Sequence, residues 1–453
     1  MDFHTARLRT ARSKCALALA LLLASISTSA AAYPAASRAG GSLPDPVWLT
    51  LGADAFEVAL RALPPVGLEA PLPRLAEADG VVITRVPRAA LEPLAERIHA
   101  ELHRCGGFLV HDTLEEAEAA LDRWRNGTAS PLALPFTIDE PDWVATVAGG
   151  VQESQILATM TALSTQFPNR YHAGTWGTVA ANWIHDQWAG LAAGRPDVTV
   201  ELYSHGGITP QPSVVLTIPG TTLPDEIVVI GGHEDSITSD CGSDPDCVAP
   251  GADDNGSGIA VLSEVVRAAL AEDFRPQRTV QFMAYAAEEV GLYGSDDIAS
   301  DYNATNADVV GVLQMDMTGY HGSVEDVVMI SDHVDPELTA FLEDLLDAYQ
   351  PGLLWTTDFC GYACSDHASW NAQGYRSSFA FESRFGEDDP WIHTSFDLID
   401  NLVGGAPGGA AHAARFARLA AAFLVEASLD GPVLPFRDGF ESGGTTRWTS
   451  TIP

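Results

Sequence analysis

The sequence has little positive charge. It holds 24 Lys and Arg against 61 Asp and Glu, which gives a formal net charge of −37 at pH 7, and Lys14 is the single lysine. A strongly acidic surface repels the phosphates of nucleic acids. The composition therefore argues against nucleic acid as a partner.

The N-terminal region lacks an apolar run long enough to cross a bilayer. The run Cys15–Ile26 has twelve residues, whereas a transmembrane helix needs about 20. Arginines precede this run, and the small-residue sequence Ala30-Ala31-Ala32 ends the segment. This order is typical of a secretory signal peptide with an A-x-A cleavage site. We expect residues 1–32 to be that signal peptide, the protein to be secreted or periplasmic, and no membrane anchor.

Cysteine is scarce, and the sequence contains no C-x-x-C pair. A sulfur-ligated structural zinc site of the usual kind is therefore not expected. After the signal peptide five cysteines remain, namely Cys105, Cys241, Cys247, Cys360 and Cys364. In an exported protein the short spacings favour two local disulfides, Cys241 with Cys247 and Cys360 with Cys364. Cys105 would then be unpaired, unless its segment is itself removed.

Residues 33–141 are predicted to form a small α/β unit. They contain the strand-like run Gly80–Val86 and the helix-like runs Leu91–His103 and Thr113–Trp124. A unit of roughly 95 residues can just fold alone. We interpret it as an N-terminal propeptide that blocks a site until it is cut, with a permanent accessory domain as the alternative. Residues 431–453 are interpreted as a C-terminal tail too short to form a core.

Residues 142–430 alternate amphipathic helices with short apolar runs rich in β-branched residues. The runs are Val198–Tyr203, Val214–Ile218, Ile227–Ile230, Val280–Tyr285, Val309–Met315 and Val327–Ile330. Runs that are apolar on both faces are typical of parallel strands covered by helices. We therefore expect an α/β domain, a three-layer α/β/α sandwich with a mostly parallel central sheet.

Side chains that can bind metals follow three of these runs within four residues. His233 follows the run that ends at Ile230, Glu288 and Glu289 follow the run that ends at Tyr285, and Asp316 follows Met315. The carboxyl ends of strands in an open parallel sheet border one crevice. We expect these side chains to meet there.

Two further residues complete a ligand set. Asp253 lies in a tight turn before the helix-like run Ile259–Leu270, and His393 lies in a late loop. A turn, a helix N-cap or a calcium loop would use the same residue types as this Asp253 segment, so alone it is weak evidence. Two imidazoles with three carboxylates suit zinc, and a spare acid suits a metal-activated water. The set predicts a two-metal hydrolase in which Asp253 bridges the metals.

Neighbouring acids in these segments are expected to have different roles. Asp235 is two residues beyond His233, so on an extended chain it points the same way and can orient the His233 ring. Glu288 and Glu289 are adjacent and point apart, so one can bind metal while the other accepts a proton from water. The residues by themselves leave open which of the two does which.

Six segments in order resemble the secreted bacterial leucyl aminopeptidase family of the Vibrio/Aeromonas type, which are di-zinc exopeptidases with a phosphorylase/hydrolase-like fold. The segments are GGHEDS at 231–236, PGADDNGSG at 250–258, AYAAEEVGLYGS at 284–295, QMDMTGY at 314–320, CGYACSDHASW at 360–370 and FESRFGEDDPWIHTSFD at 381–397. A single match has little specificity, whereas six in order have much. The likeness spans most of residues 142–430.

The resemblance implies two Zn²⁺ per chain and assigns each residue a role. Asp253 would bridge the ions, with Glu289 and His393 completing one site and His233 and Asp316 the other. Glu288 would be the general base, and Asp235 would support His233. The resemblance also implies a Cys360–Cys364 disulfide, with Tyr362 near the reacting carbonyl.

The resemblance further implies an apolar pocket for the N-terminal residue of the substrate. Candidate lining residues are Met317, Phe379, Phe381, Phe385 and Ile392, although any one of them could be ordinary core. The acidic sequence Glu387-Asp388-Asp389 stands where some relatives have an aromatic residue. We expect a preference for large, Leu-like N-terminal residues. His367 is interpreted as a structural residue and not as a further ligand.

The expected partners are peptides and protein N-termini as substrates, with no nucleic acid, no membrane and a monomeric chain. Three alternatives stay open. The same fold supports a di-zinc carboxypeptidase and a one-zinc glutaminyl cyclase, and a catalytically silent binding module is a third possibility. Metal content and product analysis separate the three.

Overall fold

The computed structural model describes residues 45–62, 72–102, 104–126, 136–240, 246–402 and 409–429. The expected signal peptide and the expected C-terminal tail lie outside these ranges, as does Cys241. The helices within them include none that is both long and apolar enough to span a membrane.

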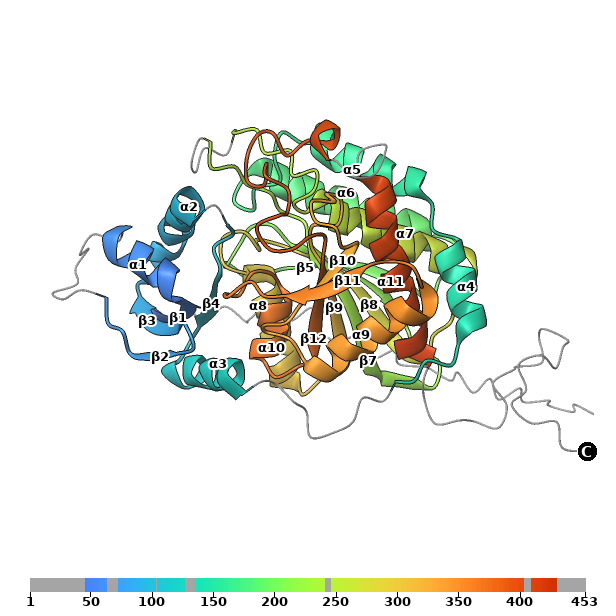
Figure 1. The fold of residues 1–453 in the computed structure, drawn as a ribbon, viewed down its shortest axis with the longest axis horizontal. Helices are drawn as coiled ribbons and strands as arrows, with labels where there is room; N and C mark the ends of the chain where they lie inside the picture. The colour runs from blue at the N-terminus through green and yellow to red at the C-terminus, as the bar shows by residue number, and fades with distance from the viewer. Residues whose placement is uncertain are drawn as a thin grey trace, which may run out of the picture. The chain divides into compact units, whose positions relative to one another are not determined.

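The N-terminal unit is a four-stranded antiparallel sheet with helices (Figure 1). Its strand order is β2-β3-β1-β4, with β1 (Val47–Gly52), β2 (Ala76–Ala78), β3 (Val81–Val86) and β4 (Phe108–His111). Its helices are α1 (Ala53–Ala62), α2 (Leu91–Leu102) and α3 (Leu114–Asn126), with a 3₁₀ turn at Arg88–Ala90. The strand and the two helices expected from the sequence are confirmed to within two residues at each end.

The larger unit is built on an eight-stranded sheet with the order β11-β10-β12-β9-β7-β8-β6-β5. The strands are β5 (Thr199–Tyr203), β6 (Ser213–Ile218), β7 (Leu223–His233), β8 (Arg278–Tyr285), β9 (Asp308–Met315), β10 (Val327–Ile330), β11 (Trp355–Asp358) and β12 (Ser377–Phe381). The four central strands β12, β9, β7 and β8 are parallel, whereas β6 and β5 at one edge pair antiparallel. The expected mostly parallel sheet is confirmed.

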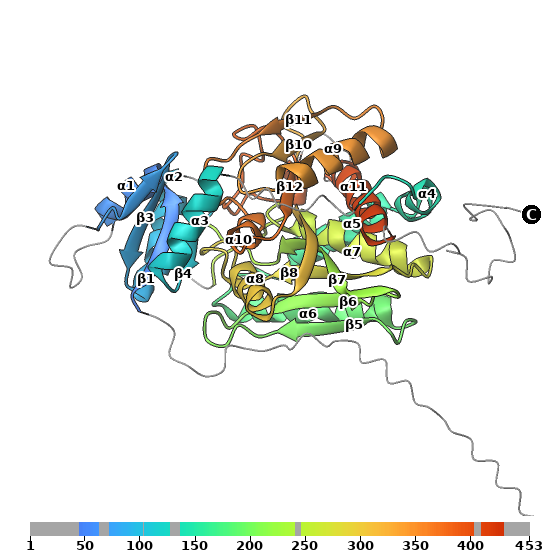
Figure 2. The ribbon, with the colours of Figure 1, turned by 90° about the horizontal axis from the view of Figure 1, so that it is seen from below.

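Helices cover both faces of this sheet (Figure 2). One layer contains α4 (Pro141–Gly149), α5 (Glu153–Gln166), α6 (Thr175–Ala192), α7 (Gly256–Ala271), α9 (Pro336–Tyr349) and α11 (Ala410–Leu429), and the other contains α8 (Tyr293–Thr305) and α10 (His367–Ala372). A 3₁₀ turn at Ile399–Asn401 precedes α11. The three-layer α/β/α sandwich expected from the sequence is therefore confirmed.

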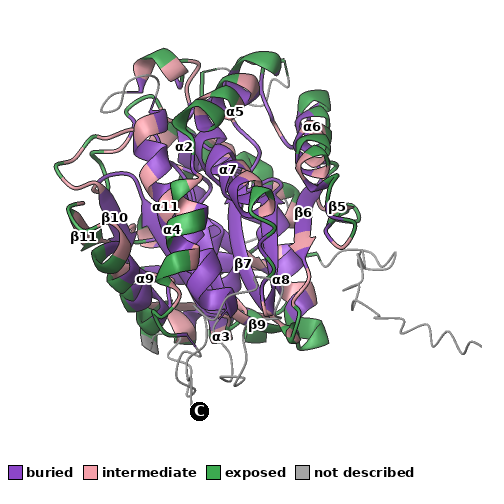
Figure 3. Ribbon diagram, turned by 90° about the vertical axis from the view of Figure 1, so that its right-hand side faces the viewer, coloured by how far each residue is buried: buried purple, intermediate pink, exposed green. Residues whose placement is uncertain are grey.

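The alternation of side chains along β7 explains the two layers. Val228 and Ile230 belong to the apolar cluster with α7 and α11, whereas Ile227 and Val229 belong to the cluster with α8. Successive side chains of a strand point to opposite faces, so an all-apolar strand must be covered twice. Figure 3 shows β7 buried over most of its length, while exposed residues lie on the outer sides of the helices.

The strand register brings the ends of the central strands together. His233 at the end of β7 pairs with Tyr285 at the end of β8, and Gly231 pairs with Gln314 near the end of β9. Gly232 permits this close approach, because a Cβ at that position would lie 2.5 Å from the carbonyl oxygen of Met315. The chain segments that follow β7, β8 and β9 therefore begin side by side.

A buried arginine fixes two of the loops at this edge. Arg170, between α5 and α6, is fully buried. Its guanidinium donates from Nε to the carbonyl oxygen of Glu234 at 2.8 Å, from Nη1 to that of Pro250 at 2.7 Å, and from Nη2 to that of Gly251 at 2.9 Å. One rigid side chain thus joins the exit of β7 to the loop that precedes α7.

We predict that Arg170→Met lowers the free energy of unfolding by about 3 kcal/mol or more, because three buried carbonyl groups lose a charged donor. Urea unfolding of the metal-free protein measures the change. Arg275→Met is the control, since Arg275 pairs with Asp273 on the surface and should cost less than about 1 kcal/mol. Equal losses in both variants would contradict this role for Arg170.

Candidate metal centre

Two histidine–carboxylate pairs flank one shared aspartate at the carboxyl edge of the sheet. His233 Nε2 lies 3.0 Å from Asp254 Oδ1 and 3.3 Å from Asp316 Oδ1. His393 Nε2 lies 3.0 Å from Asp254 Oδ2 and 2.9 Å from Glu289 Oε2. All five side chains are buried. The two oxygens of Asp254 therefore face two separate groups of ligand-type atoms.

The spacing and chemistry of these atoms fit zinc. Donor atoms around a tetrahedral zinc lie about 3.3 Å apart, because its bonds to nitrogen and oxygen are about 2.0–2.2 Å long. Among the described residues, both Glu289 oxygens and Asp316 Oδ1 have no hydrogen-bond partner although they are buried. Buried carboxylates without donors are costly unless a cation compensates them. His233, Asp254 and Glu289 also form a cluster with metal-site spacing.

The carboxylates favour positive charge at both histidines. Burial by itself lowers the pKa of His393, but the charges of Glu289 and Asp254 outweigh it and raise that pKa to about 10. Burial likewise opposes protonation of His233, yet Asp316, Asp235 and Asp254 hold its pKa well above the usual range. The cluster is therefore a site of strongly negative potential, as a binding site for divalent cations requires.

The structure corrects the sequence interpretation at Asp253. The Asp253 carboxylate accepts hydrogen bonds from the backbone N–H groups of Gly319 at 2.8 Å and Tyr320 at 3.0 Å. The next residue, Asp254, occupies the position between the two histidines that was expected for Asp253. In a turn, the backbone conformation and not a side-chain period decides which of two adjacent acids points inward, so the sequence did not separate them. His233, Glu289, Asp316 and His393 lie together as expected.

Asp235 lies beside His233, where the sequence placed it. His233 Nδ1 is 3.3 Å from Asp235 Oδ1. The same carboxylate accepts hydrogen bonds from the backbone N–H groups of Glu288 at 3.0 Å and Glu289 at 3.3 Å. Asp235 thus holds the ring of His233 and the start of the Glu288–Glu289 segment together.

Asp397 and Ser365 also position the ligands, and their roles were not predicted from the sequence. Asp397 accepts the backbone N–H of Asp253 at 2.8 Å and that of Asp254 at 3.0 Å, one with each carboxylate oxygen. The hydroxyl of Ser365 donates to Asp316 Oδ2 at 2.6 Å. Both residues lie inside the family-like segments, and Asp397 is the acid four residues after His393. Its contact with the 253–254 loop is between segments far apart in the sequence, so no local pattern signals it.

Glu288 faces the cavity next to this cluster. It is buried, and its Oε1 has no hydrogen-bond partner among the described residues. Burial raises its pKa well above the usual range, and the neighbouring charge of Glu289 adds to this effect. A carboxylate of this kind is suited to accept a proton.

The cavity has a volume of about 350 Å³ and joins the metal-type residues to the expected apolar pocket. Every pocket candidate named from the sequence lines it, namely Tyr362, Met317, Phe379, Phe381, Phe385 and Ile392. The aromatic members contact one another, with ring centroids of Phe379 and Phe381 5.6 Å apart. The arrangement can hold an apolar side chain beside the proposed reacting centre.

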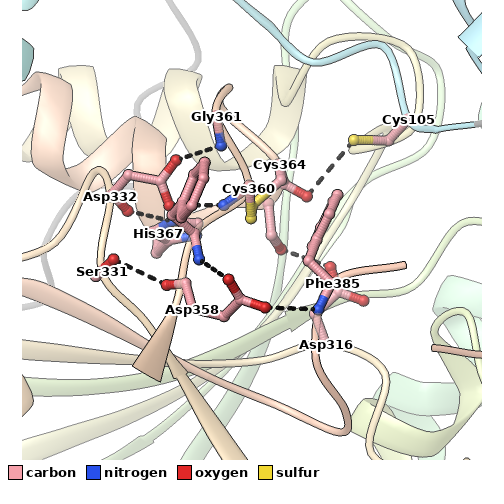
Figure 4. Close-up of a disulfide and its surroundings, with 12 residues drawn as sticks. Cys105, Asp316, Ser331, Asp332, Asp358, Cys360, Gly361, Cys364, His367 and Phe385 are labelled. Atoms are coloured by element: carbon pink, nitrogen blue, oxygen red, sulfur yellow. Dashed lines mark hydrogen bonds between the residues drawn. A yellow bond between two sulfur atoms is a disulfide. The ribbon is translucent and has the colours of Figure 1, made fainter. Parts of the chain in front are cut away.

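The Cys360–Cys364 disulfide is present at the rim of this cavity (Figure 4). The backbone N–H groups of Cys360 and Gly361 donate to Asp332 at 3.0 and 2.6 Å. His367 Nε2 lies 3.2 Å from the carbonyl oxygen of Asp332, away from the metal-type cluster, in agreement with a structural role. Cys247 is disulfide-bonded, and its expected partner Cys241 lies outside the described residues.

The end of α2 and the segment after it reach the same cavity from the N-terminal unit. Gly106 N donates to the carbonyl oxygen of Glu289 at 3.2 Å, and the free thiol of Cys105 lies 3.5 Å from the carbonyl oxygen of Cys364 (Figure 4). The guanidinium of Arg104 lies 3.7 Å from the ring centroid of Tyr362. Cys105 is thus unpaired, as expected from the cysteine spacings.

Known proteins resemble the chain in sequence. The model of peptidase family M28 matches residues 213–417. A probable leucine aminopeptidase of Arthroderma benhamiae is 36% identical over 274 residues, which cover 60% of this chain and 73% of that protein. A probable leucine aminopeptidase of Arthroderma otae is 33% identical over 312 residues, covering 68% and 82%.

Solved structures agree with this relationship. The crystal structure of LapB from Legionella pneumophila has a TM-score of 0.68 at 28% identity and covers 85% of this chain and 99% of its own. The Legionella pneumophila LapA aminopeptidase has a TM-score of 0.68 at 27% identity, covering 86% and 100%. Residues 142–430 make up only about two thirds of the chain, so these likenesses extend into the N-terminal unit. By sequence identity and coverage, this chain belongs to peptidase family M28.

Proposed function

We propose that this M28 metallo-aminopeptidase is an exported di-zinc enzyme that removes large apolar residues from the N-termini of peptides and proteins. The observation that carries the proposal is the aspartate shared by two histidine–carboxylate pairs. Asp254 presents one oxygen to His233 and the other to His393. A single-metal site needs no such shared carboxylate.

In this proposal His233 and Asp316 would hold one zinc ion, Glu289 and His393 would hold the other, and Asp254 would contribute to both. Zinc supplies Lewis acidity, which lowers the pKa of a water molecule toward 7 and polarises a carbonyl group. Asp235, Ser365 and Asp397 keep the ligands in place through the hydrogen bonds described above.

Glu288 is the general base. Its side chain faces the cavity and has an oxygen without a partner, so it can take a proton from the attacking water. The same carboxyl group then donates that proton to the departing amine. Tyr362 lines the same cavity and would lie near the reacting carbonyl.

The N-terminal residue of the substrate occupies the apolar part of the cavity. Met317, Phe379, Phe381 and Ile392 provide its walls, with Phe385 at the half-exposed rim. A pocket of this composition favours large apolar side chains through burial of their surface. The enclosure favours a chain end over an internal peptide bond.

We also propose that residues 33–141 are a propeptide that blocks this cavity. Leu102, Arg104 and Cys105 line it, and the ring of His99 lies 5.2 Å from that of His393. The contact is supported by an apolar cluster in which Phe108 of β4 packs with Ala287 and Val290 after β8. A substrate would have to displace these groups. Export by the signal peptide, and a monomeric chain, belong to the same proposal.

The alternatives are separated by metal content and products. A one-zinc glutaminyl cyclase would bind one equivalent of zinc and cyclise N-terminal glutamine without releasing a residue. A di-zinc carboxypeptidase would release C-terminal residues, and a silent binding module would turn over nothing. Two equivalents of zinc together with release of N-terminal leucine fit the proposed enzyme alone.

We predict that Asp254→Asn lowers the bound zinc from two equivalents toward zero, because the shared anionic ligand is lost. Metal analysis after dialysis at fixed free zinc measures the stoichiometry. Asp253→Asn is the matched neighbour and should retain more zinc, since Asp253 contacts backbone N–H groups. Retention of both ions by Asp254→Asn with loss in Asp253→Asn would reverse the assignment.

We predict that Glu288→Gln keeps two equivalents of zinc but lowers kcat for leucine p-nitroanilide by about 10²–10⁴-fold, because no group accepts the proton of water. Glu337→Gln, on the exposed start of α9, is the control and should retain its turnover. Loss of zinc in parallel with activity in Glu288→Gln would show that Glu288 is a ligand instead.

We predict that proteolytic removal of the N-terminal unit raises kcat/KM for leucine p-nitroanilide. Limited proteolysis of the zinc-loaded full chain, followed over time by activity and by N-terminal sequencing, measures this. New N-termini near residue 141 should appear together with the gain in activity. An uncut chain that is as active as the cut one would show that residues 33–141 are a permanent accessory domain.

A further inference from the structure

We infer that Asp388 makes the substrate pocket accept N-terminal arginine and lysine, with their apolar stems on the pocket wall and their cationic ends at this carboxylate. The inference rests on the proposed aminopeptidase function and names a further substrate class for the same site.

Asp388 belongs to the wall of the cavity. It lines the same space as Phe379, Phe381 and Ile392, and it is half-buried. Gly386 N donates to Asp388 Oδ1 at 2.6 Å, which fixes the side chain in its turn. Among the described residues, no basic side chain lies within 4 Å of the Asp388 carboxylate. Burial raises its pKa, as expected for a carboxylate with incomplete solvation.

The charge of Asp388 is not used by the proposed metal ligands. Asp254, Glu289 and Asp316 would supply three carboxylates to the two ions, and among the described residues Asp388 is not one of the carboxylates in ion-pair distance of His233 or His393. The apolar wall leads to a negative charge that has no Arg or Lys partner among the described residues. An isolated carboxylate beside apolar surface can recognise a side chain that carries a positive charge at the end of an apolar stem.

Arginine and lysine match this combination. Their three or four methylene groups can lie along apolar surface while the charged end reaches a polar group. An arginine already occupies this cavity, because Arg104 stacks on Tyr362 with its guanidinium 3.7 Å from the ring centroid. The contact shows that the aromatic wall accommodates a guanidinium by cation–π attraction. Arg104 is paired with Asp54 of the same N-terminal unit, so removal of that unit would take both charges out of the cavity together.

The test compares arginine, lysine and leucine p-nitroanilides with zinc-loaded enzyme in the form recovered after secretion. The wild-type enzyme should hydrolyse the arginine and lysine substrates in addition to the leucine substrate. Asp388→Asn keeps the acceptor for Gly386 N and removes the charge. It should lower the ratio of kcat/KM for arginine to that for leucine by about tenfold or more, the effect of losing a charge-assisted hydrogen bond.

The matched control is Glu387→Gln, which removes the same charge from the adjacent exposed residue outside the cavity. Its arginine-to-leucine ratio should stay within about twofold of the wild type, as is usual for an exposed charge. An unchanged ratio in Asp388→Asn, an equal loss on all substrates, or a wild-type enzyme that cleaves only leucine would each overturn the inference. Zinc-loaded protein that cleaves none of the three, leucine included, would instead overturn the proposed function itself.

Discussion

The site depends on one buried carboxylate, that of Asp254, being held between the imidazoles of His233 and His393. Asp254 can face both His233 and His393 only if the loop before α7 meets the end of β7 and the loop after β12 at a fixed distance. Asp397 fixes that loop through two backbone N–H groups, and Arg170 fixes it through the carbonyl of Gly251. The three-layer fold is the frame that makes these contacts possible, because three parallel strands end at the same edge.

The centre concentrates negative charge where water is excluded. Three carboxylates meet two imidazoles, and a fourth, Glu288, lies beside them with an unpartnered oxygen. Such an arrangement is unfavourable without cations, since burial penalises each charge and the like charges repel. The same feature makes it a strong ligand set for divalent ions. Folding of this edge and metal binding are therefore expected to be linked.

The N-terminal unit uses the substrate cavity for its own contacts. Arg104 lies on the ring of Tyr362, and Gly107 lies so close that a Cβ there would be 2.5 Å from the same ring. Its core also includes side chains from the segment after β8, so one apolar cluster spans both units. The segment that fills the cavity has the chemistry of the basic substrates inferred above, because Arg104 places a cation over an aromatic ring. The proposed inhibition and the proposed acceptance of basic residues thus have a common physical origin.

The sequence by itself determined six of the eight strands of the large sheet and most of the ligand set. Apolar runs predicted every central strand except β12. His233, Glu289 and Asp316 follow these runs within four residues, and they reach the site because the carboxyl ends of the parallel strands lie at the same edge of the sheet. The four-residue spacing of Cys360 and Cys364 was enough to suggest their disulfide. Only the tertiary structure chose Asp254 over Asp253, placed Arg170 and Asp397 behind the ligands, and set Asp388 on the cavity wall. These residues act through contacts between segments far apart in the chain, and such contacts leave no periodic pattern in the sequence.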